Sequence, residues 1–332
     1  MPLTFGYVAA SEQFHPRELV ELAAHAQTRG FSGVMVADHF QPWLPRHGHS
    51  AFVWGLLSAL GERTAGDLGP GVSAPTFRYH PAIVAQAAAT LEAMYPGRSW
   101  LGLGSGEAIN EHVVAQYWPE APERIGRLFE AVDLIKRLFA GSLAGRDTRF
   151  AGQYFRLEAT RLWTMPDAAP PVLVAASGPV TAKRAGRVAD GLITQDAPLE
   201  RMAHLLARFA DGAREAGKDP ARMPKLLQVR LSWARTDEEA WAGALEEWPL
   251  GAIGLARSDL RSPVDVAQLA ASVRREDFGD RMVVSADPDV HRAALQRYVD
   301  LGFDRIYLRN VGRNQREWID VCGREVLPRI VR

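Results

Sequence analysis

An acid and an imidazole stand side by side in residues 36–43, which read VADHFQPW. Asp38 and His39 follow a short apolar run, and Trp43 comes soon after them. Histidine can take up or release a proton near neutral pH, which suits it to acid–base catalysis. Because successive strand residues point to opposite faces, we expect only one of the pair to point inward. The alternative is structural, with Asp38 capping a helix and His39 hydrogen-bonded in the core.

Two further acids follow apolar runs. Glu12 lies in AASEQF, and Glu107 lies in LGLGSGEAINEH. Each could carry a proton, and for each the alternative is a capping or surface role. Gly102, Gly104 and Gly106 do not form the dinucleotide motif G-x-G-x-x-G, because Glu107 occupies the position of the last glycine. Such alternating glycines would instead let a flat ring or a phosphate approach the backbone.

Two loops have sequences suited to holding a cofactor. Ser177 and Gly178 stand between an apolar run and the stretch PVTAKRAG, where the free N–H groups of a helix start could receive a phosphate. The stretch GPGVSAPTFRYHP, residues 69–81, suggests unusual backbone geometry beneath a cofactor, or simply tight barrel packing.

Other chemistries have little support. His47 and His49 form an H-x-H pair without the further ligands of a metal site. There is no G-x-S-x-G motif, and the single cysteine, Cys322, is expected to be a packing residue in a reducing compartment.

Lys plus Arg and Asp plus Glu both number 39, so no net charge attracts nucleic acid or membrane. Without a signal peptide or a long apolar segment, we expect a cytoplasmic protein.

Strands and helices must position these residues. In 16–30, Leu19, Leu22, Ala23 and Ala26 recur at helical spacing. Eight strand candidates alternate with such amphipathic stretches: 3–10, 33–39, 68–74, 99–106, 171–177, 191–194, 226–234 and 305–311. This alternation predicts an α/β protein with a parallel sheet, and eight units in 332 residues favour a (β/α)₈ TIM barrel.

We expect a single domain, 1–332, with surplus length at 107–124, 141–170 and 247–288. In 141–170 the pattern resembles a small hairpin. Insertions of this kind should follow the carboxyl ends of strands or cover the mouth of the barrel, where barrel enzymes keep their active sites. A domain boundary at 141–170 is the alternative.

Six motifs occur in a characteristic order: SEQF…PRELVELA, DHFQPW, PTFRYHPAIVAQA, LGLGSGEAINE, SGPVTAKRAGRVADG and SADPD. With them the chain, from residue 3 to 329, closely resembles the deazaflavin (coenzyme F420)-dependent glucose-6-phosphate dehydrogenase branch of the bacterial luciferase-like barrel family. The resemblance implies a (β/α)₈ barrel, usually a homodimer, with coenzyme F420 in the barrel mouth.

The resemblance also implies roles for individual residues. His39, or Glu12 in a competing assignment, would take the hydroxyl proton, Trp43 would stabilise the anionic reduced ring, and Glu107 would protonate it. The implied contacts with the cofactor are Asp38, Gly71, Val72, Gly106, Asn110, Ala176, Ser177 and Gly178. The resemblance also implies a non-prolyl cis peptide bond between Gly71 and Val72.

The substrate pocket departs from the family pattern. The family holds the sugar phosphate with two lysines and an arginine. Arg281 matches the arginine, and Arg257 stands at one lysine position. The other lysine has no counterpart, since Gln195 and Asp196 occupy that part of the pocket. Each lost charged hydrogen bond would weaken phosphate binding by about 1–3 kcal/mol.

The expected function is hydride transfer from the anomeric carbon of a sugar 6-phosphate, glucose 6-phosphate first, to C5 of the deazaflavin, giving a lactone. The first alternative is an F420-dependent dehydrogenase of a non-phosphorylated sugar or a secondary alcohol. Further alternatives are an FMN-dependent monooxygenase and a non-catalytic cofactor-binding barrel. We expect a small-molecule substrate as the partner, with no nucleic acid, no membrane and no metal.

Overall fold

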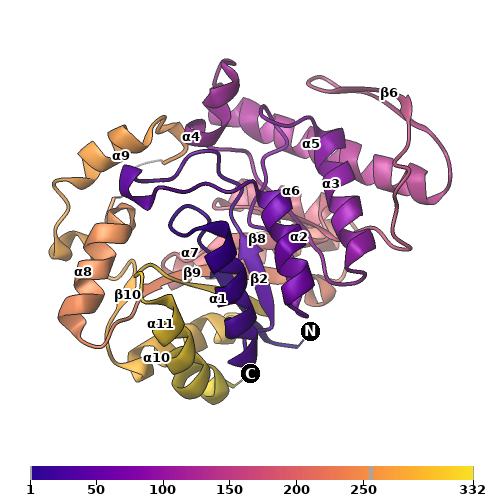
Figure 1. Ribbon diagram of the computed structural model, residues 1–332. Coiled ribbons are helices and arrows are strands. Elements are labelled where there is room, and N and C mark those ends of the chain that lie inside the picture. The colour runs from indigo at the N-terminus through magenta and orange to yellow at the C-terminus, as the bar shows by residue number, and fades with distance from the viewer. Residues whose placement is uncertain (1, 254–256, 332) are drawn as a thin grey trace.

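The computed structural model describes residues 2–253 and 257–331 (Figure 1). Its main sheet is parallel and follows the order β3-β2-β1-β11-β9-β8-β7-β4, with the short β10 (Val283–Val284) pairing with β9. These strands coincide with the eight predicted ones: β1 (Thr4–Ala9), β2 (Gly33–Val36), β3 (Asp67–Pro70), β4 (Leu101–Leu103), β7 (Val172–Ala175), β8 (Gly191–Gln195), β9 (Lys225–Ser232) and β11 (Arg305–Asn310).

The two end strands of this order, β3 and β4, meet and close the sheet. Isolated parallel bridges join Leu68 to Ser99 and Ser73 to Leu103. The first and last barrel strands are also paired, with Thr4 opposite Arg305 and Tyr7 opposite Leu308. The predicted (β/α)₈ barrel is therefore confirmed.

Helices cover the outside of the barrel (Figure 1). In α1 (Pro16–Thr28) the predicted stripe of Leu19, Leu22, Ala23 and Ala26 is buried. The first-turn proline and the N-cap of His15, which accepts from the Arg17 amide at 3.3 Å, begin this helix. The helices are α1 (Pro16–Thr28), α2 (Val53–Arg63), α3 (Pro81–Met94), α4 (Ala108–Glu111), α5 (Ala121–Leu143), α6 (Pro179–Val188), α7 (Leu199–Glu215), α8 (Asp237–Glu247), α9 (Pro263–Ala270), α10 (Pro288–Asp300) and α11 (Gln315–Val321).

Alternate strand residues fill the interior of the barrel, as parallel strands with two covered faces require. This interior cluster is apolar and comprises Val8, Met35, Trp100, Leu173, Ile193, Leu226 and Tyr307, with Val72 and Ala175 packed against it. It forms a solid floor beneath the carboxyl ends of the strands. Polar side chains can therefore gather above it at the mouth.

Two of the insertions meet at that mouth. Ile109, from the insertion at 107–124, shares a buried cluster with Trp248 and Phe278 from the insertion at 247–288, and Trp43 joins the same cluster. The insertions thus form a wall around the predicted catalytic tryptophan. None of the described helices combines the length and apolar character needed to cross a membrane.

The hairpin in 141–170 is present but not where we expected it. Its strands, β5 (Thr148–Ala151) and β6 (Arg156–Thr160), follow helix α5 rather than the carboxyl end of a strand. The hairpin packs along α5, where Glu130 accepts from the amides of Tyr154 and Phe155 at 2.8 Å each. In Figure 1 it projects beyond α5 at the edge of the molecule. The expectation that all three insertions shape the mouth is therefore wrong for this one.

Candidate active site

His39 lies between two carboxylates at the mouth of the barrel. It comes shortly after β2, and its Nδ1 is 3.7 Å from Glu12 Oε1, in the loop after β1. Its Nε2 is 3.7 Å from Glu107 Oε2, at the start of α4. The structure therefore brings together three predicted residues from three strand ends. A proton taken up by either ring nitrogen would leave a cation that both acids stabilise.

Glu12 is fully buried, whereas the Glu107 side chain is 34% exposed. Burial by itself raises the pKa of Glu12, but the positive charge of Arg309, with smaller contributions from His39 and others, lowers it to about 2. Among the described residues, neither Glu12 oxygen has a hydrogen-bond partner, and neither has His39 Nδ1. Such orphaned buried atoms are typical of a site that awaits a polar ligand.

Trp43 forms the wall beside the histidine. Its ring lies 5.3 Å from that of His39 and meets Trp248 edge-on at 6.1 Å. The loop between His39 and Trp43 is held by Asn110, whose Oδ1 accepts from the Phe40 amide at 2.9 Å. Asn110 thus supports the catalytic loop through its side chain, while its predicted backbone contact with the cofactor stays a prediction.

Asp38 and His39 both follow the end of β2 and have different side-chain partners. Ser73 Oγ donates to Asp38 Oδ2 at 2.6 Å, and Arg78 Nη2 and the Tyr79 hydroxyl donate to Oδ1 at 2.9 and 3.3 Å. The carboxylate joins the end of β2 to the segment after β3. Its contact with the cofactor stays a prediction.

The predicted cis peptide bond between Gly71 and Val72 is present. The alternating glycines in and just after β4 do not form an open face. A Cβ on Gly102 would lie 2.3 Å from the Pro70 carbonyl, and one on Gly104 would lie 2.5 Å from Val72 Cγ2. Tight barrel packing thus accounts for these two glycines. Gly106 differs, since its φ of +86° requires a glycine.

The loop after β7 offers an open helix start. Gly178 is the N-cap of α6 and makes no side-chain cap, and no heavy atom lies within 4 Å of where its Cβ would be. The amides of the first turn can therefore receive a phosphate. Ala176 and Ser177 precede this N-cap, and their predicted contacts with the cofactor stay predictions.

The structure describes the side chains of three of the four predicted substrate-binding residues. Asp196 Oδ1 lies 3.9 Å from Arg230 Nη1, and the same nitrogen donates to Gln195 Oε1 at 3.0 Å. Arg281 is exposed and donates to the Ala252 carbonyl at 2.6 Å. The side chain of Arg257 lies outside what the structure describes. Arg230, which the sequence reasoning missed, is thus a cation beside Asp196 at the mouth.

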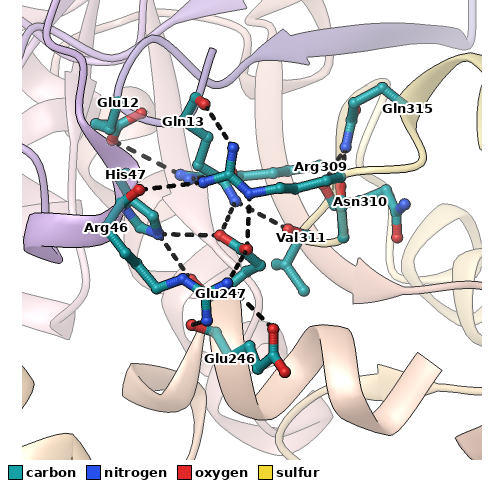
Figure 2. Close-up of polar contacts among 12 residues, drawn as sticks. Glu12, Gln13, Arg46, His47, Glu246, Glu247, Arg309, Asn310, Val311 and Gln315 are labelled. Carbon is teal, nitrogen blue, oxygen red and sulfur yellow. Dashed lines mark hydrogen bonds and ion pairs between the residues drawn. The ribbon is translucent and has the colours of Figure 1, made fainter. Parts of the chain in front are cut away.

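Arg309 was also missed. It is 2% exposed, and its Nη1 lies 3.7 Å from Glu12 Oε1 (Figure 2). Arg230 and Arg309 are paired in register on neighbouring strands, and their guanidinium groups lie 4.7 and 5.0 Å from the centre of the Trp248 ring. The available signal was an arginine inside an otherwise apolar strand pattern, in LLQVRLSWA and RIYLRNV. Buried strand arginines need a polar site to face.

Glu111 is a further buried acid near the site. Its Oε2 accepts from the Arg78 amide at 2.9 Å, and Arg78 also holds Asp38. Burial is the main reason that the pKa of Glu111 rises to about 7, and the negative charges of Asp38 and Glu107 add to this rise. Its signal in the sequence was a second acid in GEAINEH, which helical spacing from Glu107 turns toward the same region.

The surroundings of His47, His49 and Cys322 indicate structural roles for these residues. His47 is 1% exposed and its Nε2 lies 3.1 Å from the Glu247 carbonyl, while His49 stacks edge-on against His15. Within the described residues, no group of three or more His, Cys, Asp or Glu side chains could hold a metal. Cys322 is 2% exposed, and burial raises the pKa of its thiol.

Comparison with known proteins shows the family to which the chain belongs. A profile described as luciferase-like monooxygenase matches residues 3–305. A protein of Microbacterium testaceum named F420-dependent glucose-6-phosphate dehydrogenase is 38% identical over 334 residues, covering 99% of this chain and 98% of the relative. A protein of the same name from Mycobacterium avium is 36% identical over 335 residues, covering 99% and 98%.

A solved structure is similar over the full length. It is an F420-dependent secondary alcohol dehydrogenase in complex with an F420-acetone adduct, 31% identical, with a TM-score of 0.93 and 100% of both chains covered. The family profile and the relatives each span nearly the whole chain. The chain therefore belongs to the luciferase-like monooxygenase family, as its sequence motifs predicted.

Proposed function

We propose that this protein is an F420-dependent dehydrogenase that oxidises the anomeric carbon of a sugar 6-phosphate, glucose 6-phosphate in the first place. The observation that carries the proposal is the position of His39, 3.7 Å from Glu12 on one side and 3.7 Å from Glu107 on the other. Relatives named F420-dependent glucose-6-phosphate dehydrogenase, 36–38% identical over nearly the whole chain, support the choice of cofactor and substrate.

The residues present fit a deazaflavin. The open N-cap at Gly178 suits a phosphate of the cofactor, and the backbone at Gly71, Val72 and Gly106 suits the ring. Backbone and side-chain groups of Asp38, Asn110, Ala176 and Ser177 would complete the binding site. When bound, the deazaflavin would supply the hydride acceptor.

His39 is our choice as the proton acceptor for the substrate hydroxyl. A carboxylate whose pKa is about 2, such as that of Glu12, is a weak base at neutral pH. Its negative charge beside Nδ1 would instead stabilise the cation that His39 becomes after accepting a proton. Glu12 therefore supports the base rather than replacing it.

Glu107 and Trp43 complete the catalytic set. Glu107 faces His39 Nε2 from the more open side of the mouth, where it can hold or return a proton. Trp43 is 4% exposed and belongs to the apolar wall beside His39. This wall would keep water away from the reacting carbon.

A second candidate function is the oxidation of a neutral sugar or secondary alcohol. The carboxylate of Asp196 beside Arg230 favours it, since a negative charge at the mouth opposes a phosphate dianion. The structural similarity to a secondary alcohol dehydrogenase also favours it. Arg230, Arg281 and Arg257 support the sugar phosphate.

We further propose a cytoplasmic homodimer. The family resemblance supports the dimer, and a chain with one buried cysteine needs no oxidising compartment. Light scattering on the purified protein tests the dimer, for which a mass near twice 36.5 kDa is expected. A mass equal to one chain would contradict it.

The test of function is spectroscopic. Oxidised F420 is mixed with the protein, and glucose 6-phosphate, glucose or a secondary alcohol is added. Loss of the visible absorbance with glucose 6-phosphate is expected, and loss only with a neutral substrate would favour the second candidate. FMN binding with oxygen-dependent turnover, or tight F420 binding without turnover on a broad panel, would contradict both.

A further inference from the structure

A chain of buried polar contacts leads from Glu12 to α8 (Figure 2). Gln13 Nε2 donates to the Val311 carbonyl at 2.9 Å and to Glu247 Oε2 at 3.2 Å. Because both partners are hydrogen-bond acceptors, they must face the amide nitrogen of Gln13, and its amide oxygen points to the opposite side. There it accepts from Arg309 Nη2 at 3.0 Å.

Arg309 is fixed from two sides. Gln13 holds one end of its guanidinium, and the indole of Trp248 lies 5.0 Å from it. At 2% exposure the side chain has little room for another rotamer. This clamp directs Nη1 toward Glu12 Oε1 at 3.7 Å.

The charged or titratable groups that face Glu12 come from three elements. They are Arg309 from β11, His39 after β2, and His47 from η1 (Pro45–His47). Burial and the nearby Arg309 lower the pKa of His47 to about 4, so it is neutral above pH 5. Within the described residues, Arg309 is thus the only permanent cation within 4 Å of the Glu12 carboxylate.

We propose that Arg309 is a positioning residue which, clamped by Gln13, keeps the buried Glu12 carboxylate ionised and directed at His39. It acts on the reaction through Glu12, because a charged Glu12 stabilises the protonated His39 and a neutral Glu12 does not. The kinetic consequence rests on the proposed function. The ionisation of Glu12 does not, so it can be measured separately.

The first experiment measures the ionisation of Glu12 in the protein without cofactor. The side-chain carboxyl carbons of glutamate are labelled with ¹³C, and the signal missing from Glu12→Gln identifies Glu12. In the wild type this signal should stay that of a carboxylate from pH 8 to about pH 4. In Arg309→Met it should titrate between pH 5 and 8, because burial then dominates.

The second experiment compares kcat with glucose 6-phosphate across pH. The ratio of Arg309→Met to wild-type kcat should fall at least about tenfold from pH 8 to pH 5.5, with the KM and the affinity for F420 within about threefold. Arg309→Lys keeps the charge and should restore the pH profile. In an Arg309→Met/Glu12→Gln double variant, the loss should not exceed that of Glu12→Gln by more than about twofold.

Two further variants test whether the effects of Arg309→Met come from the loss of its charge or from misfolding and nonspecific perturbation. Gln13→Leu removes the clamp without removing the charge and should shift the Glu12 titration in the same direction by a smaller amount. Arg313→Met removes a cation that binds Glu247 at 2.8 Å and donates to the backbone carbonyl of Gln13 at 3.3 Å, but it leaves the Gln13 side chain and Arg309 in place. It should leave the Glu12 signal and the pH profile unchanged.

The results separate the two proposals. A Glu12 signal that stays ionised down to pH 5 in both Arg309→Met and Gln13→Leu overturns the role of Arg309, whatever the substrate. A kcat ratio independent of pH overturns its kinetic consequence. If glucose 6-phosphate does not reduce F420 in the wild type, the proposed function fails while the titration still decides the role of Arg309.

Discussion

Asp196 Oδ1 lies 3.9 Å from Arg230 Nη1, and both side chains are only 10% exposed. The family resemblance predicts a phosphate-binding lysine in this part of the mouth, and this chain has none there. An acid there lowers the positive potential that a sugar phosphate meets, and it draws on a cation that could otherwise bind the phosphate. We therefore expect the choice between a phosphorylated and a neutral substrate to depend on this pair.

Asp196→Asn should lower the KM for glucose 6-phosphate by about 3- to 10-fold, which is roughly 1 kcal/mol of binding. The KM for a neutral sugar or alcohol should change less than twofold. Steady-state kinetics with both substrates measures the difference. Asp211→Asn, at a surface carboxylate of α7 paired with Arg208, is the matched control. An unchanged or higher KM for the phosphate would place Asp196 outside the electrostatic field of the substrate.

Asp259 joins two insertions of the mouth. Its Oδ1 accepts from Trp118 Nε1 at 3.0 Å and from Arg124 Nη1 at 2.9 Å. Asp259→Ala should raise the KM for the substrate by about 2- to 5-fold, since a partly exposed charged pair contributes up to about 1 kcal/mol, while kcat stays within about twofold. Asp280→Ala, an exposed acid of the same insertion, is the control. A loss in kcat at constant KM would contradict a role of Asp259 in holding these two insertions at the substrate site.

Glu111 should make stability depend on pH. Its pKa rises from 4.5 to about 7 in the folded protein, so between these values the folded state holds a proton that the unfolded chain has released. The free energy of unfolding therefore falls as pH rises through this window, by an amount on the order of 3 kcal/mol from Glu111 alone.

Glu111→Gln removes this titration. Urea unfolding at pH 5 and pH 8 should show a smaller difference in free energy of unfolding for the variant than for the wild type. Glu200→Gln, an exposed acid of α7, should retain the wild-type difference. If the free energy of unfolding changed by the same amount between pH 5 and pH 8 in Glu111→Gln and in the wild type, Glu111 would be ionised throughout this range.

The strands of the barrel were predictable because their signal is local. Short apolar runs indicate strands, and apolar residues at helical spacing, such as Leu19 and Leu22, indicate amphipathic helices. The alternation of strands and helices along the chain then favours a parallel barrel. His39, Glu12 and Glu107 were found by the same logic, since each follows an apolar run. Residues at carboxyl ends of barrel strands share one face.

The supporting contacts could not be predicted, because closure of the barrel creates them. Arg309 meets Gln13 across 296 residues of sequence, and Gln13 meets Glu247 across 234. No local pattern relates such positions. The hairpin at β5 and β6 was misplaced for a similar reason, since its sequence specifies the turn but not the helix face against which Phe150 packs. The side-chain partners of Asp38 likewise depend on where the segment after β3 passes.

We expect His39, held between Glu12 and Glu107, to take the proton when a sugar phosphate gives up its hydride. A single-turnover measurement tests it directly, with excess protein and glucose 6-phosphate mixed with oxidised F420 and the visible absorbance followed in time. The wild type should bleach the cofactor, and His39→Ala should bleach it at least about 100-fold more slowly, with its affinity for F420 within a few-fold. Equal rates in the two proteins would contradict the claim.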